Sequence, residues 1–208
     1  MHTNNIHTEK AYMERAHGPV SPVYYTDGRP ITVGYKLLDE LSIQGALVID
    51  VGAFAGFIGN YCLQRGARVT LIDIFKGAFP SFMFSVQGSK EQMPFRDNFF
   101  DFAVCGDTLH HGDLDSTLLE IYRILRPGGQ FISVREPCIA SSEDEWTVLQ
   151  KDCGLVVAEG ICERRPNLIQ YKRALTVFPK FSVYSGVDLT PAKDLNYGDK
   201  GIVIKAIK

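Results

Sequence analysis

The sequence has no excess of charge of either sign, because 22 Lys and Arg residues stand against 24 Asp and Glu residues. Acids and bases are interspersed, so we expect neither nucleic acid nor an anionic membrane as a partner. No apolar run approaches the ~20 residues of a membrane-spanning helix, and the first residues, Met1–Asn5, are polar. We therefore expect a cytoplasmic, globular protein without a membrane span or secretory signal.

The sequence also lacks C-x-x-C pairs, internal repeats and a linker that would divide it into two domains. Its five cysteines are odd in number, and Cys62 and Cys105 lie in apolar segments, which predicts core thiols in a reducing compartment. Residues 1–30 show little periodicity, so we expect an N-terminal extension, with a short helix over 8–17. Tyr24 and Tyr25 would form part of a lid there, or an aromatic staple. Residues 31–208 are expected to form a single domain.

Apolar runs alternate with helix-period segments along most of the chain. Helices are predicted over residues 31–41, 56–65, 114–125, 143–151 and 168–177, and strands over 46–51, 68–72, 83–87, 99–105, 130–134, 181–185 and 201–207. The connection between Asp73 and residue 83 contains Gly77 and Pro80 and is short, so its crossover helix should be reduced to a turn or missing. The pattern predicts an α/β fold with a doubly wound, mostly parallel sheet and an antiparallel C-terminal edge strand.

The most informative segment is residues 46–56, an apolar run that ends in Asp50 and breaks into Gly52 and Gly56. A helical pattern follows at once, which is the strand, turn and helix N-terminus that α/β folds use to hold a nucleotide. The next apolar run ends in Asp73, whose carboxylate can accept hydrogen bonds from both ribose hydroxyls. Together these features predict a site for an adenosine-type cofactor.

Three ordered segments carry a resemblance to a known family: Asp50–Gly56, then Asp73, then blocks between Glu91 and Glu136 that contain Met93-Pro94-Phe95, Gly106-Asp107-Thr-Leu-His-His and Arg126-Pro-Gly-Gly. With these segments the chain resembles the class I S-adenosylmethionine-dependent methyltransferases, in particular their small-molecule branch. The likeness covers roughly residues 40–137. It implies a Rossmann-like fold and S-adenosylmethionine as cofactor, with S-adenosylhomocysteine as product.

The resemblance also implies which residues surround the cofactor. Near its methionine end would lie Asp50, Gly52, Ala53 and Gly56, and at the ribose Asp73 and Ile74. Ser89, Lys90 and Glu91 would approach adenine, and Gly106 and Asp107 would border the sulfonium. The acceptor would be a small molecule, with O-methylation of a sugar or natural-product-like hydroxyl or carboxyl favoured.

Three departures from the family pattern support a second hypothesis. Phe54 replaces the middle glycine of the turn, Ser89 stands where many relatives have an acid, and the segment after Asp73 is shortened. These changes are compatible with a methyltransferase-like pseudoenzyme that serves as a binding or partner subunit. A dehydrogenase is the third alternative, in which Met93–Phe95 and Arg126–Gly129 would have no role.

Candidate catalytic residues follow two of the predicted strands. His110 and His111 come after the fourth strand, and histidine is suited to take a hydroxyl proton near neutral pH. His111 or Glu136 would be the base; alternatively, one histidine packs and the other caps the helix at Leu114. Glu136 and the neighbouring Arg135, which could clamp an acidic substrate, could equally form a surface ion pair.

Other sites have less support in the residues. Glu163, Arg164 and Arg165 would belong to a loop that closes over substrate, or to a solvated helix cap. No metal site is predicted, because His110, His111 and Asp113 lie too close in sequence to converge on one ion. No cysteine lies beside an obvious base. A homodimer is possible, and the sequence does not fix the oligomeric state.

Overall fold

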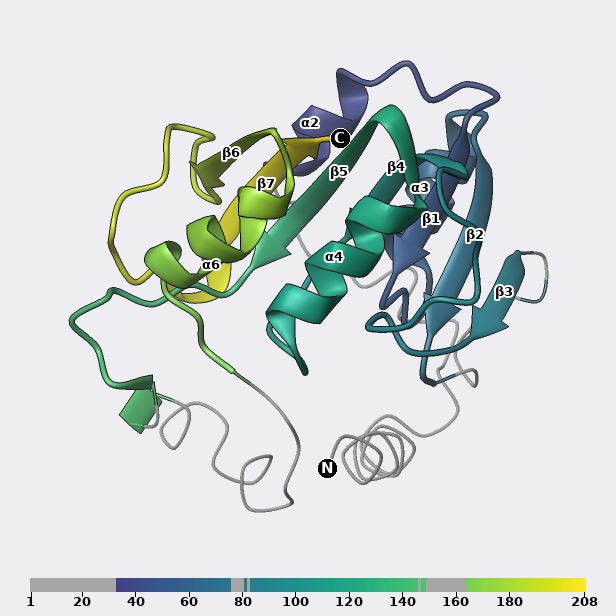
Figure 1. Cartoon of the computed structure of the whole chain (residues 1–208). Helices are drawn as coiled ribbons and strands as arrows, with labels where there is room; N and C mark the ends of the chain where they lie inside the picture. Colours follow the sequence, from purple (N-terminus) through teal and green to yellow (C-terminus); the bar gives the residue numbers. More distant parts are fainter. Residues whose placement is uncertain (1–32, 76–80, 82, 146, 149–163) are drawn as a thin grey trace.

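The computed structural model describes residues 33–75, 81, 83–145, 147–148 and 164–208 (Figure 1). The predicted N-terminal extension, its helix over 8–17, and Tyr24 and Tyr25 lie outside the described residues, as does Glu163. None of the helices in the described ranges has the length and apolar character that crossing a membrane requires.

A seven-stranded sheet forms the centre of the molecule, with strand order β3-β2-β1-β4-β5-β7-β6. Neighbouring strands from β3 to β5 pair in parallel, whereas β7 is antiparallel to β5 and β6. The predicted mostly parallel sheet with an antiparallel C-terminal strand is therefore confirmed, with β7 one place in from the edge that β6 forms. The strands are β1 (Leu47–Val51), β2 (Arg68–Asp73), β3 (Phe84–Gln87), β4 (Phe100–Cys105), β5 (Leu125–Glu136), β6 (Lys180–Ser185) and β7 (Ile202–Ile207).

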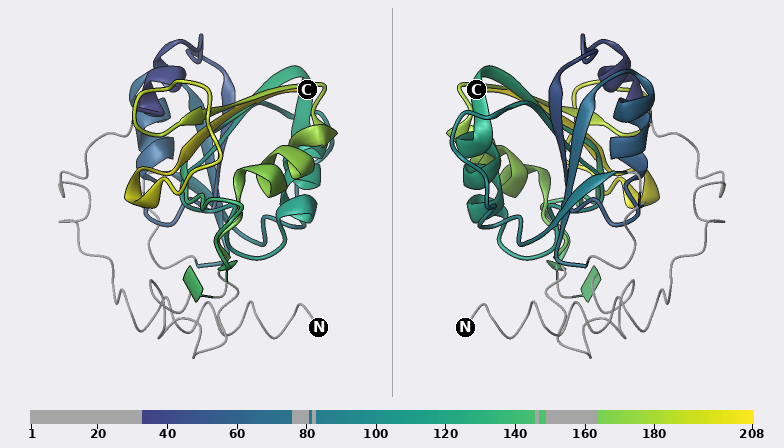
Figure 2. Two further views of the ribbon diagram at one scale, coloured as in Figure 1. Left: turned by 90° about the vertical axis from the view of Figure 1, so that its left-hand side faces the viewer. Right: turned by 90° about the vertical axis from the view of Figure 1, so that its right-hand side faces the viewer.

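Helices cover both faces of the sheet, as the two side views show (Figure 2). On one face lie α2 (Tyr35–Asp39) and α3 (Phe57–Gln64), and on the other lie α4 (Leu114–Ile124) and α6 (Leu168–Ala174). The 3₁₀ turn η3 (Leu175–Val177) follows α6 directly, and a second 3₁₀ turn, η4 (Gly198–Lys200), comes later in the chain. Leu38 and Cys62 belong to the core of the first face, and Ile121 and Tyr171 to that of the second. Cys62 and Cys105 are buried free thiols, as predicted.

The expected boundaries hold closely, with one informative exception around Arg126–Gly129. The helix before this segment ends at Ile124 as expected, but β5 begins already at Leu125 instead of at Gln130. The register jumps between the pairs Phe100–Leu125 and Phe102–Gln130, so the turn residues form a bulge within the strand. Lys208 fixes the bulge, because its carbonyl accepts from the Gly128 N–H and its own N–H donates to the Gly129 carbonyl.

Two other predicted elements are only partly described. In the segment that joins β2 to β3, the described residues are not helical, and the rest lies outside the described residues. The missing crossover helix therefore stays a prediction. The helix predicted over 143–151 has helical residues at 145, 147 and 148, where the Asp144 carboxylate accepts the Thr147 N–H at 2.8 Å. Helix α2 is shorter than the predicted 31–41.

The parallel strands end at one edge of the sheet, where open α/β sheets bind their ligands. This edge brings together the ends of β1 and β2, which carry Asp50 and Asp73, and the ends of β4 and β5, which carry Cys105 and Glu136. The acids that the sequence analysis placed at strand ends therefore meet at one edge, whereas Arg126–Gly129 lies at the opposite end of β5.

Candidate cofactor and acceptor site

The turn after β1 has the backbone conformation that its glycines permit. Gly52 and Gly56 have φ angles of 64° and 73°, in the left-handed region. A Cβ atom on Gly52 would lie 2.3 Å from the Thr108 side chain, so only glycine fits where the turn meets the loop after β4. The N–H groups of Gly52 and Ala53 both donate to the Ile72 carbonyl, at 2.9 and 3.0 Å, which ties the turn to β2.

Phe54 takes a left-handed conformation in spite of its side chain, with φ at 45°. Such a conformation costs a non-glycine residue about 1–2 kcal/mol. Two interactions offset this cost: the Phe54 N–H donates to Asp73 Oδ2 at 2.8 Å, and the ring packs against the small cluster of Ala55 and Phe75. The substitution thus leaves the turn closed in a conformation usual for glycine.

Asp73, at the end of β2, keeps acceptor capacity for a ligand. Its Oδ2 accepts from Phe54 and its Oδ1 from the Phe75 N–H, each at 2.8 Å. The Ile74 N–H also contributes, and since a carboxylate has about four lone-pair positions, roughly one remains for a further donor such as a ribose hydroxyl. Burial raises the pKa of Asp73, while the bonds from Phe75 and Phe54 and the charge of Lys90 oppose the rise. This donor and acceptor chemistry fits an adenosine group.

Asp50 is placed differently, because its carboxyl is almost fully buried. Its Oδ2 accepts the Gly59 N–H at 2.7 Å, in the first turn of α3, where a negative charge is favourable. Burial raises its pKa to about 7, and the bond from Gly59 opposes the shift. Asp50 therefore joins β1 to α3 beneath the turn.

Residues after β3 form the next side of the site. The Ser89 hydroxyl accepts the Glu91 N–H at 3.1 Å, and Glu91 Oε1 accepts the Asp113 N–H at 2.7 Å. A Cβ atom on Gly112 would lie 2.2 Å from the same Glu91 oxygen. Glu91 thus fixes the loop before α4. Ile74, beside Asp73, accepts a hydrogen bond from Gln87 through its carbonyl.

Gly106 and Asp107 form the turn after β4. A Cβ atom on Gly106 would lie 3.0 Å from Ile58 and Val134, so the backbone passes close to α3 and β5. Asp107 has a φ of 53°, and its carboxylate pairs with Arg135 Nε at 2.8 and 2.9 Å. The alternative in which Arg135 and Glu136 form a surface pair is wrong, because Glu136 is fully buried.

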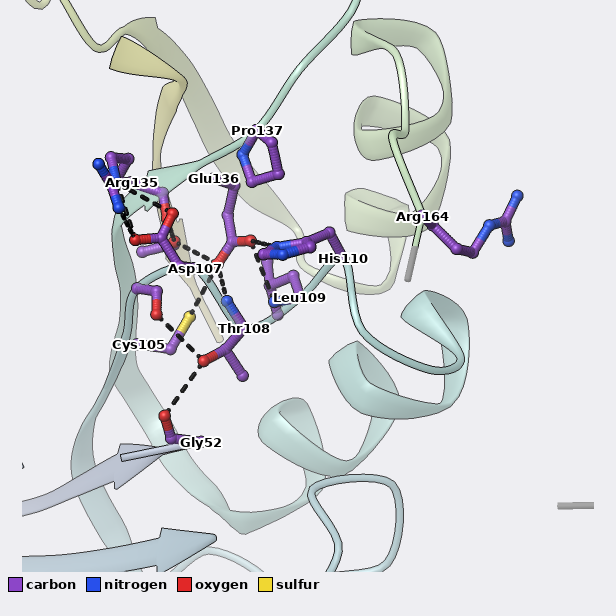
Figure 3. Close-up of polar contacts among 12 residues, drawn as sticks. Gly52, Cys105, Asp107, Thr108, Leu109, His110, Arg135, Glu136, Pro137 and Arg164 are labelled. Carbon is purple, nitrogen blue, oxygen red and sulfur yellow. Dashed lines mark hydrogen bonds and ion pairs between the residues drawn. The ribbon is translucent and has the colours of Figure 1, made fainter. Parts of the chain in front are cut away.

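The Glu136 carboxylate accepts hydrogen bonds from four groups of the described chain and also contacts His110, which lies beside it in Figure 3. Oε1 accepts from the Thr108 N–H and the Ser133 hydroxyl, both at 3.1 Å, and from the Cys105 thiol at 3.7 Å. Oε2 accepts from the Leu109 N–H at 3.0 Å and lies 3.1 Å from His110 Nδ1. Burial raises the pKa of Glu136 to about 7 against these donors.

The two histidines differ in exposure and lie against each other. His110 is buried, His111 is half-buried, and their ring centroids are 4.2 Å apart. The alternative in which a histidine caps the following helix is wrong, because the N-cap of α4 is Asp113, whose carboxylate accepts the Ser116 N–H at 2.7 Å.

The segment before α6 reaches the same loop through its backbone. The Arg164 N–H donates to the His110 carbonyl at 2.9 Å, while its side chain points away from Glu136 (Figure 3) and pairs with Glu145. The Arg165 N–H also donates to Glu145. Glu145 thus holds Arg164 through an ion pair and Arg165 through its backbone N–H.

Two participants were not singled out from the sequence, Thr108 and Ser133. The Thr108 hydroxyl shares its donor between the Gly52 carbonyl at 3.2 Å and the Gly106 carbonyl at 3.1 Å, and the first contact connects the nucleotide turn to the loop after β4. Thr108 lies within the quoted Gly-Asp-Thr-Leu-His-His block, which is the signal that could have found it, whereas Ser133 lies inside a strand without such a signal. Among the described residues no group of three or more His, Cys, Asp or Glu could hold a metal ion.

The geometry defines a doubly wound domain with a nucleotide-type turn and a buried Glu–His pair at one sheet edge. A family model described as "Methyltransferase domain" matches residues 49–133. Residues 49–133 are therefore similar to a methyltransferase domain. The match speaks against the dehydrogenase alternative.

Similar proteins include the ubiquinone/menaquinone biosynthesis C-methyltransferase UbiE of Brucella canis, which is 34% identical over 120 residues. That match covers 50% of this chain and 42% of the Brucella protein, so the chain spans less than half of this relative.

Solved structures confirm the fold at low sequence identity. Geranyl diphosphate C-methyltransferase from Streptomyces coelicolor, solved with Mg²⁺, geranyl-S-thiolodiphosphate and S-adenosyl-L-homocysteine, has a TM-score of 0.63 at 16% identity, covering 84% of this chain and 74% of that one. Phosphoethanolamine N-methyltransferase 2 from Haemonchus contortus was solved with S-adenosyl-L-methionine. It has a TM-score of 0.68 at 16% identity, and the match covers 85% of this chain and 45% of the Haemonchus chain.

Proposed function

We propose that the protein transfers a methyl group from S-adenosylmethionine to a small-molecule acceptor. The observation that carries this proposal is the partly satisfied carboxylate of Asp73 beside the closed turn at Gly52–Gly56. Proteins similar to this chain are named methyltransferases. Similar structures contain bound S-adenosylhomocysteine or S-adenosylmethionine, which supports the choice of cofactor.

Each group of residues at the sheet edge has a proposed part in holding the cofactor. Asp73 and Ile74 would hold the ribose, and Asp50, Gly52, Ala53 and Gly56 the methionine end, with Asp50 acting through α3. Ser89, Lys90 and Glu91 would border the adenine. Gly106 and Asp107 would face the sulfonium.

When bound, S-adenosylmethionine supplies a methyl group whose bond to sulfur breaks as a bond to the acceptor forms. The chain's own residues then have two tasks: alignment of the acceptor and removal of its proton. We assign proton removal to the histidine pair, because imidazole titrates near neutral pH and both rings follow β4 at the carboxyl edge. Glu136 lies behind His110.

O-methylation is the acceptor chemistry we favour, since a base beside the site serves a hydroxyl acceptor directly. C-methylation is the second candidate, because the Brucella relative is named a C-methyltransferase. One base can serve both reactions: a phenol that loses its proton becomes nucleophilic at oxygen and at the neighbouring ring carbon. A hydroquinone with an open ring position therefore separates them, because mass and NMR spectra of the product distinguish a methoxy group from a ring methyl.

Calorimetric titration with S-adenosylmethionine and S-adenosylhomocysteine tests the proposal. We expect saturable binding of both, weakened about tenfold or more in Asp73→Asn, because a hydrogen bond to a charged group contributes about 1.5–3 kcal/mol. Asp115→Asn, an exposed acid on α4, is the matched control and should bind like the wild type. Wild-type binding weaker than millimolar for both ligands would reject the proposal.

The pseudoenzyme remains the competing hypothesis, with Phe54 as its main support. A pseudoenzyme that binds cofactor would pass the titration but transfer no methyl group to any acceptor of a broad phenol, carboxylate and amine panel.

The sequence also predicts a cytoplasmic location and no nucleic-acid or membrane partner, and it allows a homodimer. The location and the partners stay predictions, and sedimentation equilibrium would establish the oligomeric state.

A further inference from the structure

The carboxylate of Glu136 connects two parts of the site that the sequence separates. Its two oxygens each accept one backbone N–H from the loop after β4, Oε1 from Thr108 and Oε2 from Leu109. The Thr108 hydroxyl continues to the Gly52 carbonyl, and Oε2 also meets His110 Nδ1. One side chain thus reaches the nucleotide turn in one direction and the histidine in the other (Figure 3).

The chemistry of this contact fixes the state of the His110 ring. An ionised carboxylate only accepts hydrogen bonds, so when Glu136 is ionised, Nδ1 of His110 carries the proton that it donates to Oε2. In the neutral ring, Nε2 is then the basic nitrogen. The same carboxylate is fully buried and has a donor on each oxygen from the backbone, so it acts through the groups that it holds.

We propose that Glu136 is a positioning residue that fixes the tautomer of His110 and, through Thr108, the Gly52 end of the nucleotide turn. The role at the nucleotide turn rests on the proposed function, because that function makes the turn a cofactor site. The first half of the proposal, the His110 tautomer, concerns contacts within the chain alone. It differs from the role of base that the sequence suggested for Glu136.

Several titratable or charged groups surround the pair and enter any pH-dependent measurement. Cys105 faces Glu136 from β4, Asp107 from the following turn, and Tyr171 from α6. Arg135, the next residue on β5, pairs with Asp107. A test must therefore remove the charge of Glu136 while leaving these groups in place.

Glu136→Gln is such a change, because it keeps the shape and removes the charge. In either orientation its amide NH₂ faces one of the two backbone N–H groups, so we expect a lower melting temperature. The decisive readout is the ¹⁵N and ¹H NMR titration of His110 in the cofactor-free protein. We expect the Nδ1–H tautomer in the wild type, and in Glu136→Gln a fall of the His110 pKa by about one unit or more, or a change of tautomer.

Two control variants separate positioning from a purely structural role. Ser133→Ala removes a donor from Glu136 but keeps the carboxyl group, so it should lower the melting temperature, keep the His110 tautomer and shift the His110 titration less than Glu136→Gln does. Thr108→Val keeps the N–H bond to Glu136 and removes the hydroxyl bond to Gly52, so it should weaken S-adenosylhomocysteine binding severalfold without changing the titration.

The proposal is overturned if His110 is the Nε2–H tautomer in the wild type, a result that needs no variant. It is also overturned if Glu136→Gln and Ser133→Ala titrate alike, or if Thr108→Val binds S-adenosylhomocysteine as the wild type does. If the wild type binds neither cofactor form, the proposed function fails, whereas the His110 titration still decides the first half of this inference.

Discussion

Asp73 and Glu136 are both acids at the carboxyl ends of parallel strands, yet their surroundings differ in kind. Asp73 is half-buried and accepts backbone N–H groups from Phe54, Phe75 and Ile74, which leaves about one acceptor position open. Glu136 is fully buried, accepts from four groups and also contacts His110. The comparison teaches that the number of internal donors decides the role of an acid at a strand end. An acid with few internal donors can bind a ligand, whereas an acid with many organises the protein.

The largest expected effect comes from Glu136→Leu, which removes the acceptor and leaves buried donors behind. Each unsatisfied buried group costs about 1–3 kcal/mol, so the free energy of unfolding should fall by about 3–5 kcal/mol. Asp73→Asn keeps one acceptor oxygen and should lose about 1 kcal/mol. Urea denaturation measures both. Equal losses in the two variants would break the comparison.

The second effect is the dependence of stability on pH, because Asp50 and Glu136 both have a pKa raised to about 7 by burial. A raised carboxyl pKa means that the folded state binds the proton more tightly, so this stabilisation is complete below the unfolded pKa and is lost as pH rises through about 7. Between about pH 5 and 6.5 the free energy of unfolding should fall by up to roughly 1.4 kcal/mol per pH unit for each group.

Asp50→Asn should remove the share of one group and make this slope shallower. Acids with lowered pKa, such as Glu120 and Asp194, contribute in the opposite direction and at lower pH. Chemical denaturation at several pH values gives the slope directly. A variant slope equal to that of the wild type would show that Asp50 titrates normally.

Phe54→Gly is expected to change the stability by less than about 1 kcal/mol, because relief of the left-handed strain is offset by glycine's entropy and by lost packing. Phe54→Ala keeps the strain and loses the packing, so it should be the less stable of the two. For an adapted enzyme, cofactor affinity in Phe54→Gly should fall or stay level. A sharp rise in calorimetry would favour the pseudoenzyme instead.

The smallest effect is expected at Asp107, whose pair with Arg135 is partly exposed. Asp107→Asn should lower the free energy of unfolding by less than about 1 kcal/mol, with less effect at high salt. Thermal melts at two salt concentrations measure this. A loss comparable to that of Glu136→Leu would show that this pair, too, organises the loop.

The fold could be predicted almost completely from the sequence, because hydrophobic periodicity and glycine positions report on local structure. The strand at Arg126–Gly129 was the exception: its Pro-Gly-Gly is typical of a turn, but its backbone pairs with Lys208, which lies far away in the sequence. That long-range contact leaves no local pattern.

The sequence predicts which residues lie at the site better than it predicts what each of them does there. The motifs locate Asp73 and Glu136 equally well at strand ends, but burial and the number of donors depend on tertiary packing. The same holds for Phe54, whose left-handed conformation depends on a hydrogen bond to Asp73, 19 residues away along the chain. The pairings of Arg135 with Asp107, and of His110 with Glu136, also arise only when the strands come together.

The most direct test of the account is a crystal structure of the protein with S-adenosylhomocysteine. The account predicts that a ribose hydroxyl donates to the Asp73 carboxylate, with the ligand lying over the turn between Gly52 and Gly56. A ligand bound elsewhere, or a Phe54 ring that occupies the ribose position, would contradict it.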